Sequence, residues 1–242
     1  MLVVLSASSA FAAGSNERIE ETFDAANHLY RDEKYDDAGT AYEQILAQKK
    51  ESAAVYYNLG NAYFRKGEMA KALLNYERAL KLSPRDSDAR YNLRYVRSLF
   101  PEKVLSEKSF FTGVIDGFLS FYSIDEMVLI TTIFFVCICL LVLVISYPKW
   151  SFRWEKVLAC ILAVFFILFA AGIFIKVQIE GNAAIVLLDT DSKFEPRKDS
   201  TSYFHLGKGE KIKILHSEDD WAKIQRTDGK LGWVPRDIFE KI

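Results

Sequence analysis

The hydrophobic and polar positions divide the chain into three parts with different patterns. Two runs near the middle are almost purely apolar: residues 127–147, which carry no charge, and residues 157–175. A helix needs about 20 apolar residues to cross the hydrocarbon core of a bilayer, so each run predicts a transmembrane helix. Just before the first run, Ser123 and Glu126 match a capping box, which predicts the start of that helix.

The part before these runs has helical spacing and repeats itself with a period of 34 residues. Four residue types recur at this spacing: Asn27 and Asn61, Arg31 and Arg65, Ala38 and Ala72, and Tyr42 and Tyr76. Gly60 and Ala72 are small, which lets the two helices of the second copy cross closely. Gly67 supplies the turn between them, and Pro84 stops the second helix. Residues 89–100 resemble the start of a third copy and predict a capping helix.

These positions resemble the tetratricopeptide repeat, a peptide-binding scaffold whose first helices line a concave groove. The resemblance places eight residues in that groove: Phe23, Asn27, Tyr30 and Arg31 from the first copy, and Tyr57, Asn61, Phe64 and Arg65 from the second. Asn amides can hold the backbone of an extended peptide, and arginines can bind a carboxylate. The alternative is that the Asn and aromatic side chains only pack between helices, and we favour this for Asn58 and Asn92.

After Lys176 the chain changes to short β-rich runs separated by polar turns. These runs are residues 183–190, 210–217, 221–227 and 230–235. About five strands in roughly 60 residues predict a small closed barrel, and Asp228-Gly229 is a typical hairpin turn.

The stretch from Gly209 to Ile242 resembles the bacterial SH3 family in its turns and aromatic positions. Members of that family bind peptides or cell-wall material over exposed aromatic residues. The resemblance therefore implies a ligand surface formed by Tyr203, Phe204, Trp221, Trp233 and Pro235. For Trp233 the alternative is a place in the barrel core.

The loop between the two apolar runs, residues 148–156, is short and basic. It contains Lys149, Arg153 and Lys156 against one acidic residue, Glu155. Short basic loops stay in the cytoplasm, so these three cations are the predicted topology determinants. Two spans then place the segments on either side of the hairpin outside the cytoplasm.

The first 12 residues point to the same compartment. An apolar start followed by Ala10-Phe11-Ala12 resembles the latter part of a signal peptide, whose beginning would lie upstream. A disordered apolar tail is the alternative.

The segment before the first span contains apolar residues at steps of three and four. They are Phe111, Val114, Ile115, Phe118, Leu119 and Tyr122. This spacing predicts a short amphipathic helix that lies along the outer leaflet. Alternatively, the same residues cover the end of the helical domain.

The composition and the absence of several motifs limit the kinds of partner and site that we expect. The net charge is −1 and no Lys/Arg-rich block occurs, so nucleic acid is not an expected partner. Cys137, Cys139 and Cys160 all fall in the apolar runs, where disulfides and metal sites are not expected. No phosphate-binding loop, nucleophile elbow or paired-carboxylate motif is found, so we expect a protein without cofactor that binds rather than catalyses.

The expected architecture is a multidomain membrane protein with an all-α tetratricopeptide-repeat solenoid, a two-helix transmembrane hairpin and an all-β SH3-like barrel. Its segments are the following: signal peptide, 1–12; repeats with capping helix, 17–100; amphipathic juxtamembrane segment, 101–126; first span, 127–147; cytoplasmic loop, 148–156; second span, 157–175; SH3-like domain, 181–242.

This order of parts is similar to the BatE members of the bacterial aerotolerance family. The resemblance implies a protein of the bacterial inner membrane with both soluble domains in the periplasm. It also implies partners, namely von Willebrand-type membrane proteins and a MoxR-type ATPase, that act in envelope integrity and stress tolerance. The first hypothesis is therefore an interaction scaffold that binds partner peptides, and the second is an anchor that binds peptidoglycan through the SH3-like domain. A cytoplasmic membrane regulator is the third, if the topology is inverted.

Overall fold

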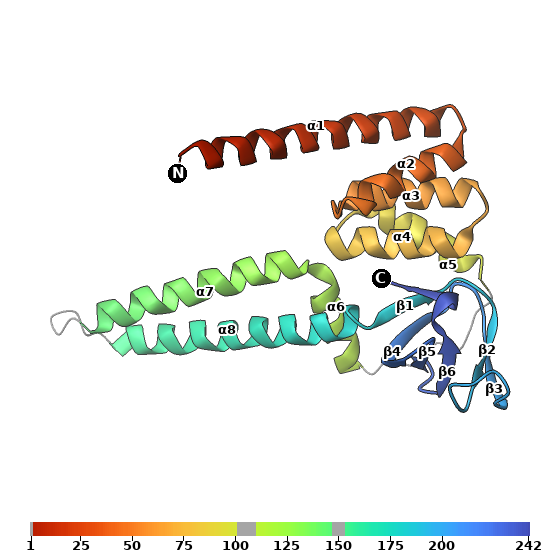
Figure 1. Cartoon of the computed structure of the whole chain (residues 1–242). Coiled ribbons are helices and arrows are strands. Elements are labelled where there is room, and N and C mark those ends of the chain that lie inside the picture. Colours follow the sequence, from red (N-terminus) through yellow and green to blue (C-terminus); the bar gives the residue numbers. More distant parts are fainter. Residues whose placement is uncertain (1, 101–109, 147–152) are drawn as a thin grey trace. The chain divides into compact units, whose positions relative to one another are not determined.

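The computed structural model describes residues 2–100, 110–146 and 153–242 (Figure 1). These residues form two compact units. The globular unit combines the described residues up to Phe100 with Ala184–Ile242, and the hairpin unit contains the described residues from Phe110 to Ala183. In the sequence, the hairpin unit is thus inserted between the two halves of the globular unit.

The first half of the globular unit is helical, as the 34-residue period predicts. Its helices are α1 (Leu2–Arg31), α2 (Tyr35–Ala47), α3 (Ala53–Arg65), α4 (Met69–Leu82) and α5 (Ser87–Ser98). Helices α1 and α2 form the first repeat, α3 and α4 form the second, and α5 takes the place of the capping helix. Residues 2–12, the predicted signal peptide, form the beginning of α1.

Packing inside the repeats explains which residues recur. Ala38 and Ala72 are fully buried, and Tyr42 and Tyr76 are each 1% exposed. A Cβ atom at Gly60 would lie 2.8 Å from the ring of Tyr76, so a larger residue would separate α3 from α4. The predicted solenoid is therefore confirmed, and its tightest crossing lies at the expected glycine.

The second half of the globular unit is an antiparallel all-β domain. Its elements are β1 (Ala183–Val186), β2 (Thr190–Lys193), β3 (Ser202–Leu206), β4 (Lys211–Glu218), β5 (Trp221–Arg226), β6 (Leu231–Pro235), a 3-10 turn (Arg236–Ile238) and β7 (Phe239–Lys241). The strand order in the sheet is β3-β2-β6-β5-β4-β1-β7. The predicted all-β fold is confirmed. The sequence indicated fewer strands, because β2 (TDSK) and β7 (FEK) are too short and polar to stand out.

The predicted hairpin turn joins β5 to β6, where Gln225 pairs with Leu231. The guanidinium group of Arg226 binds the carboxylate of Asp228 and lowers the pKa of that carboxyl to about 2. The turn is therefore held by an ion pair as well as by its backbone.

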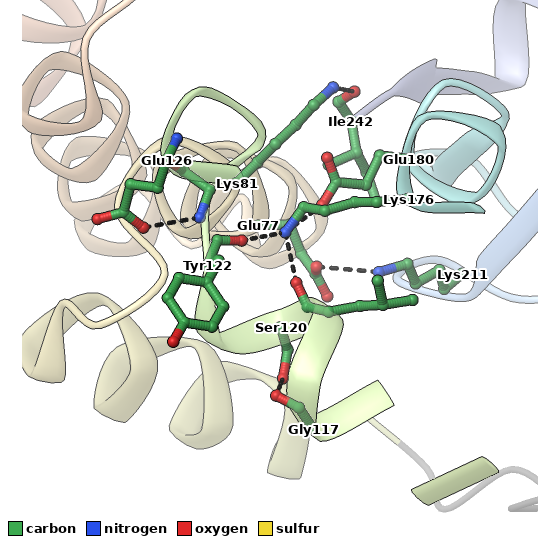
Figure 2. A network of polar contacts seen from close by, with 12 residues as sticks. Glu77, Lys81, Gly117, Ser120, Tyr122, Glu126, Lys176, Glu180, Lys211 and Ile242 are labelled. Carbon is green, nitrogen blue, oxygen red and sulfur yellow. Dashed lines mark hydrogen bonds and ion pairs between the residues drawn. The ribbon is translucent and has the colours of Figure 1, made fainter. Parts of the chain in front are cut away.

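The β domain packs against the repeats through α4. Arg78 of α4 donates to the carbonyl of Lys241 at 3.1 Å and pairs with Glu240 at 3.2 Å. Lys81 donates to the carbonyl of Ile242 at 3.0 Å (Figure 2). These bonds connect residues more than 150 positions apart and join the two halves of the globular unit.

Three further contacts support this interface. Lys211 of β4 pairs with Glu77 of α4 at 3.0 Å (Figure 2). Gly209 has a φ of +79°, and a Cβ atom there would lie 2.7 Å from the ring of Phe100. Ile185 of β1 is fully buried and belongs to the same apolar cluster as Leu73 of α4. The interface thus has an apolar centre and charged edges.

The hairpin unit consists of α6 (Phe110–Phe121), α7 (Ile124–Ile145) and α8 (Arg153–Glu180). Ile124–Ile145 and Lys156–Glu180 are long and apolar enough to cross a membrane, and almost none of either segment is buried. The first begins three residues before the predicted span 127–147, and the second ends five residues after the predicted span 157–175. The capping box is confirmed, because Ser123 accepts from the Glu126 N–H at 3.2 Å and Glu126 accepts from the Ser123 N–H at 2.9 Å.

Helices α7 and α8 pack through aromatic rings, such as Phe134 and Phe165, whose centroids lie 5.8 Å apart. Of the three predicted topology determinants, Lys149 and the side chain of Arg153 lie outside the described residues, and Lys156 is exposed at the start of its span. The three cysteines are free and exposed on the apolar helices.

The contacts between α4 and the β domain predict the topology of the chain. Two domains that touch must lie on the same side of the membrane, so cysteines introduced at Lys49 and Ser217 are expected to respond alike to a membrane-impermeant thiol reagent. Both positions are exposed. Labelling of intact spheroplasts of a variant without the native cysteines tests this. Modification of one position with protection of the other would contradict it.

Candidate functional site

The asparagines of the repeats form a hydrogen-bonded ladder across α1, α3 and α5. The side-chain carbonyl of Asn27 accepts from Tyr42 at 2.7 Å and from Asn58 at 2.9 Å. One repeat later, the carbonyl of Asn61 accepts from Tyr76 at 2.7 Å and from Asn92 at 3.0 Å. Each bond of the first set therefore has a counterpart 34 residues further on. In each repeat, the Asn of the first helix thus binds the Tyr of the second helix. It also binds an Asn of the first helix of the next repeat.

The ladder limits what Asn27 and Asn61 can do for a ligand. Both lone pairs of each side-chain carbonyl are used within the protein, so these atoms cannot accept from a peptide N–H group. The amide NH₂ groups keep their donor capacity, and both residues are partly exposed. Asn58 and Asn92 use an NH₂ donor in the ladder, which agrees with the packing role that we favour for them.

Burial also raises the pKa values of Tyr42 and Tyr76, the tyrosines that donate to the ladder. Desolvation raises the pKa of Tyr42 to about 12 and raises the pKa of Tyr76 as well. The two hydroxyls thus stay protonated at physiological pH and act as permanent donors to Asn27 and Asn61.

The remaining groove residues form an aromatic and basic surface around the ladder. Phe23 and Tyr57, which are equivalent by the 34-residue period, each place a ring centroid 6.0 Å from the ladder tyrosine of their own repeat. Tyr30 packs edge-on against Tyr35 at 5.3 Å, and the Arg65 guanidinium lies 4.6 Å from the centroid of the Tyr35 ring. Arg65 is restrained by this ring and only loosely by Glu33, 3.9 Å away.

Arg31 is exposed, and so is Arg65. Phe64 meets Tyr95 of α5 at 5.8 Å between ring centroids. The structure thus brings the eight predicted groove residues of α1 and α3 onto one surface with α5. We call this surface the first-helix face.

Two residues of the first-helix face were missed by the sequence analysis. Tyr91 and Tyr95 of α5 are 64% and 50% exposed. They occupy the positions that Tyr57 and Asn61 hold one repeat earlier, so the 34-residue period itself could have identified them. The sequence predicts α5 only as a capping helix, so Tyr91 and Tyr95 are not among the predicted groove residues.

In the β domain, the sheet register brings three of the five predicted ligand residues together. Trp221 of β5 pairs with Pro235 of β6, and Trp233 of β6 pairs with Lys223 of β5. The neighbours Ala222 and Val234 are fully buried, so the two tryptophans lie on the opposite, outer face of these strands. Trp233 is partly exposed and does not belong to the barrel core.

The prediction for Phe204 was wrong. Phe204 is 8% exposed and belongs to the core of the β domain, because side chains alternate along β3 and Leu206 faces inward with it. Tyr203 faces outward and is 46% exposed. The centroid of its ring lies 4.5 Å from the centroid of the Phe194 ring. Phe194 is 57% exposed and is not among the ligand residues predicted from the sequence. Phe194 and Tyr203 form an exposed aromatic pair.

Comparison with protein families matches two parts of the chain. The tetratricopeptide repeat matches residues 23–87, and the bacterial SH3 domain matches residues 194–238. A search among curated proteins found no match. The globular unit therefore combines tetratricopeptide repeats with a bacterial SH3-like domain, and the hairpin unit adds two helices suited to a membrane. Among the described residues, no group of three or more His, Cys, Asp or Glu side chains could hold a metal ion.

The ladder predicts a specific alkaline sensitivity. The phenols of Tyr42 and Tyr76 ionise in the unfolded chain near pH 10 but only at higher pH in the folded chain. The folded state then holds more protons, so stability is present below pH 10 and is lost as the pH rises toward about 12. Replacing both residues by Phe should lower the unfolding free energy near neutral pH by about 1 kcal/mol for each lost hydrogen bond. The same double replacement should also reduce the decrease in unfolding free energy that occurs as the pH rises above about 10.

Urea unfolding of the detergent-solubilised full chain, followed by circular dichroism at about pH 8 and about pH 11, measures both effects. Tyr91→Phe is the matched control, because this tyrosine is exposed. An alkaline loss that is the same in the double variant and in the parent would show that the ladder is not its source.

Proposed function

We propose that the protein is a membrane-anchored interaction scaffold that binds a segment of a partner protein on the first-helix face. The observation that carries this proposal is the set of unused donors and exposed rings on one surface. Among the described residues, none accepts from the NH₂ groups of Asn27 and Asn61. Arg31 and Arg65 are exposed cations, and Tyr91 and Tyr95 are exposed aromatics.

The chemistry of the face defines the ligand. Asn NH₂ groups and guanidinium groups only donate hydrogen bonds, so the ligand must supply acceptors. An extended peptide offers backbone carbonyls to the amides and an acidic side chain or terminal carboxylate to the arginines. Aromatic or apolar side chains of the same peptide would lie on Tyr91 and Tyr95. The preferred partner segment is therefore extended, acidic and partly aromatic.

The location that we propose is a bacterial inner membrane, with the globular unit in the periplasm. The basic loop between the spans and the apolar N-terminal segment both favour this orientation. In the labelling experiment described above, the proposal requires that both Lys49→Cys and Ser217→Cys are modified from outside. The resemblance to BatE proteins further suggests an aerotolerance complex with von Willebrand-type membrane proteins and a MoxR-type ATPase. No catalytic role is part of the proposal.

Site-specific photocrosslinking in cells tests the scaffold. A photoreactive residue at Arg65 or Tyr95 should capture the same partner, whereas one at Gln44, an exposed residue of α2, should not. Asn61 is unsuitable because its carbonyl holds the ladder. Arg31→Glu should weaken capture at Tyr95 at least several-fold, since it reverses the charge that faces the acidic group. Equal capture at Gln44, or none at either face position, would overturn the proposal.

A second candidate function is attachment to the cell wall through the SH3-like domain. The observation that favours it is the exposed aromatic pair of Phe194 and Tyr203, because flat apolar rings suit the faces of sugar rings. In this case the detergent-solubilised full chain should sediment with purified peptidoglycan, and the double variant Phe194→Ala, Tyr203→Ala should sediment much less. Leu215→Ala, which alters an equally exposed apolar residue of β4, is the control. Failure of the parent protein to sediment would exclude this function.

A further inference from the structure

The corner between α6 and α7 contains a buried lysine that none of the functions above uses. Lys176 of α8 is 3% exposed. Its ammonium group lies 2.6 Å from the carbonyl oxygens of Leu119 and Tyr122 and 3.1 Å from Glu180 Oε1 (Figure 2). An ammonium group has three N–H donors, so these three acceptors satisfy it completely.

The two carbonyls belong to the carboxyl-terminal end of α6, where helical carbonyls have no partner within the helix. In water such groups would be hydrated. In the hydrocarbon layer each unsatisfied carbonyl is costly, and a positive charge also complements the negative end of the helix dipole. Lys176 therefore supplies the hydrogen-bond donors and the positive charge that the end of α6 needs in order to lie away from water. The carboxylate of Glu180 balances the charge of Lys176.

The position of α6 along α8 leads to the same conclusion. The Phe118 ring lies 5.3 Å from that of Phe169, and Phe169 precedes Lys176 by seven residues, or about 10 Å of helix. A Cβ atom at Gly172, between these two, would meet Met127 at 2.7 Å and Phe118 at 3.4 Å. The last turns of α6 thus pack beside α8 within the segment suited to a membrane, not beyond its end.

The other side of this part of α6 is apolar and open. Ile115 and Phe121 are each 50% exposed, and Phe118 is 36% exposed. Helix α7, which begins three residues after the end of α6, also carries exposed apolar side chains, and Leu129 is 61% exposed. Lipid acyl chains that cover α7 would cover this part of α6 as well.

We propose that the last turns of α6 insert into the acyl-chain layer of the membrane, and that Lys176 with Glu180 forms the polar joint that makes this insertion possible. The helix then does not lie along the membrane surface, as its sequence pattern alone predicts. The hairpin enters the bilayer as three helical segments, one of which reaches only part of the way. The insertion does not depend on what the first-helix face binds.

Spin-label accessibility measures the depth of α6 directly. The full chain without its native cysteines is labelled at Ile115→Cys or Phe121→Cys and reconstituted in vesicles of phosphatidylcholine and phosphatidylglycerol. Labels at both positions and at the reference position Leu129→Cys should favour oxygen over a water-soluble nickel chelate, while a label at Ser217→Cys should favour the chelate. Labels on α6 that resemble Ser217 would overturn the insertion.

The role of the joint is tested by Lys176→Met in the Phe121→Cys chain. This change keeps an apolar stem of similar length but removes the three donors, so the label should shift toward the nickel chelate. Lys156→Met, at the exposed other end of the same span, should leave the label unchanged. An unchanged label in Lys176→Met would show that the joint is not required. If Lys176→Met fails to insert, the depth measured in the parent still decides the position of α6.

Discussion

The fold depends on one constraint: the two halves of the globular unit, which the hairpin unit separates in the sequence, must meet. Arg78 and Lys81 of α4 bind the carbonyls of Lys241 and Ile242, and Ile185 shares an apolar cluster with α4. Such an interface can form only if an even number of spans separates the halves. The number of transmembrane helices, the compartment shared by the domains and the completion of the globular unit are therefore linked.

The interface also leaves the first-helix face open. The bonds to the β domain come from α4, the second helix of its repeat, whereas the ladder asparagines and the exposed aromatics beside them lie on α1, α3 and α5. The repeats thus use one set of helices for the intramolecular contact and another for the proposed ligand. The hydrogen bonds of the ladder keep the three first helices in fixed positions, so the donors around it are arranged before a partner binds.

Much of this fold could be predicted from the sequence, because it rests on local patterns. The period of 34, the capping box at Ser123 and the turn at Asp228 each concern residues close together in the chain. The two hydrogen bonds to the side-chain carbonyl of Asn61 could not be predicted, because their donors, Tyr76 and Asn92, come from different helices. Phe204 was misplaced because the short strand β3 gave no clear alternation. In the sequence, Lys176 is only the residue after an apolar run, because nothing local indicates that it binds the carbonyls of Leu119 and Tyr122.

The ladder also determines how long a peptide segment would have to be to cross the three first helices. Neighbouring first helices are linked directly by asparagine side chains, so they lie at the usual helix spacing of about 9 Å. Three such helices span about 20 Å, and an extended chain advances about 3.3 Å per residue. The partner segment that we propose would therefore contact the first-helix face over about six residues. A recognition element of that size fits a linear motif in a terminal tail or an exposed loop better than the surface of a folded domain.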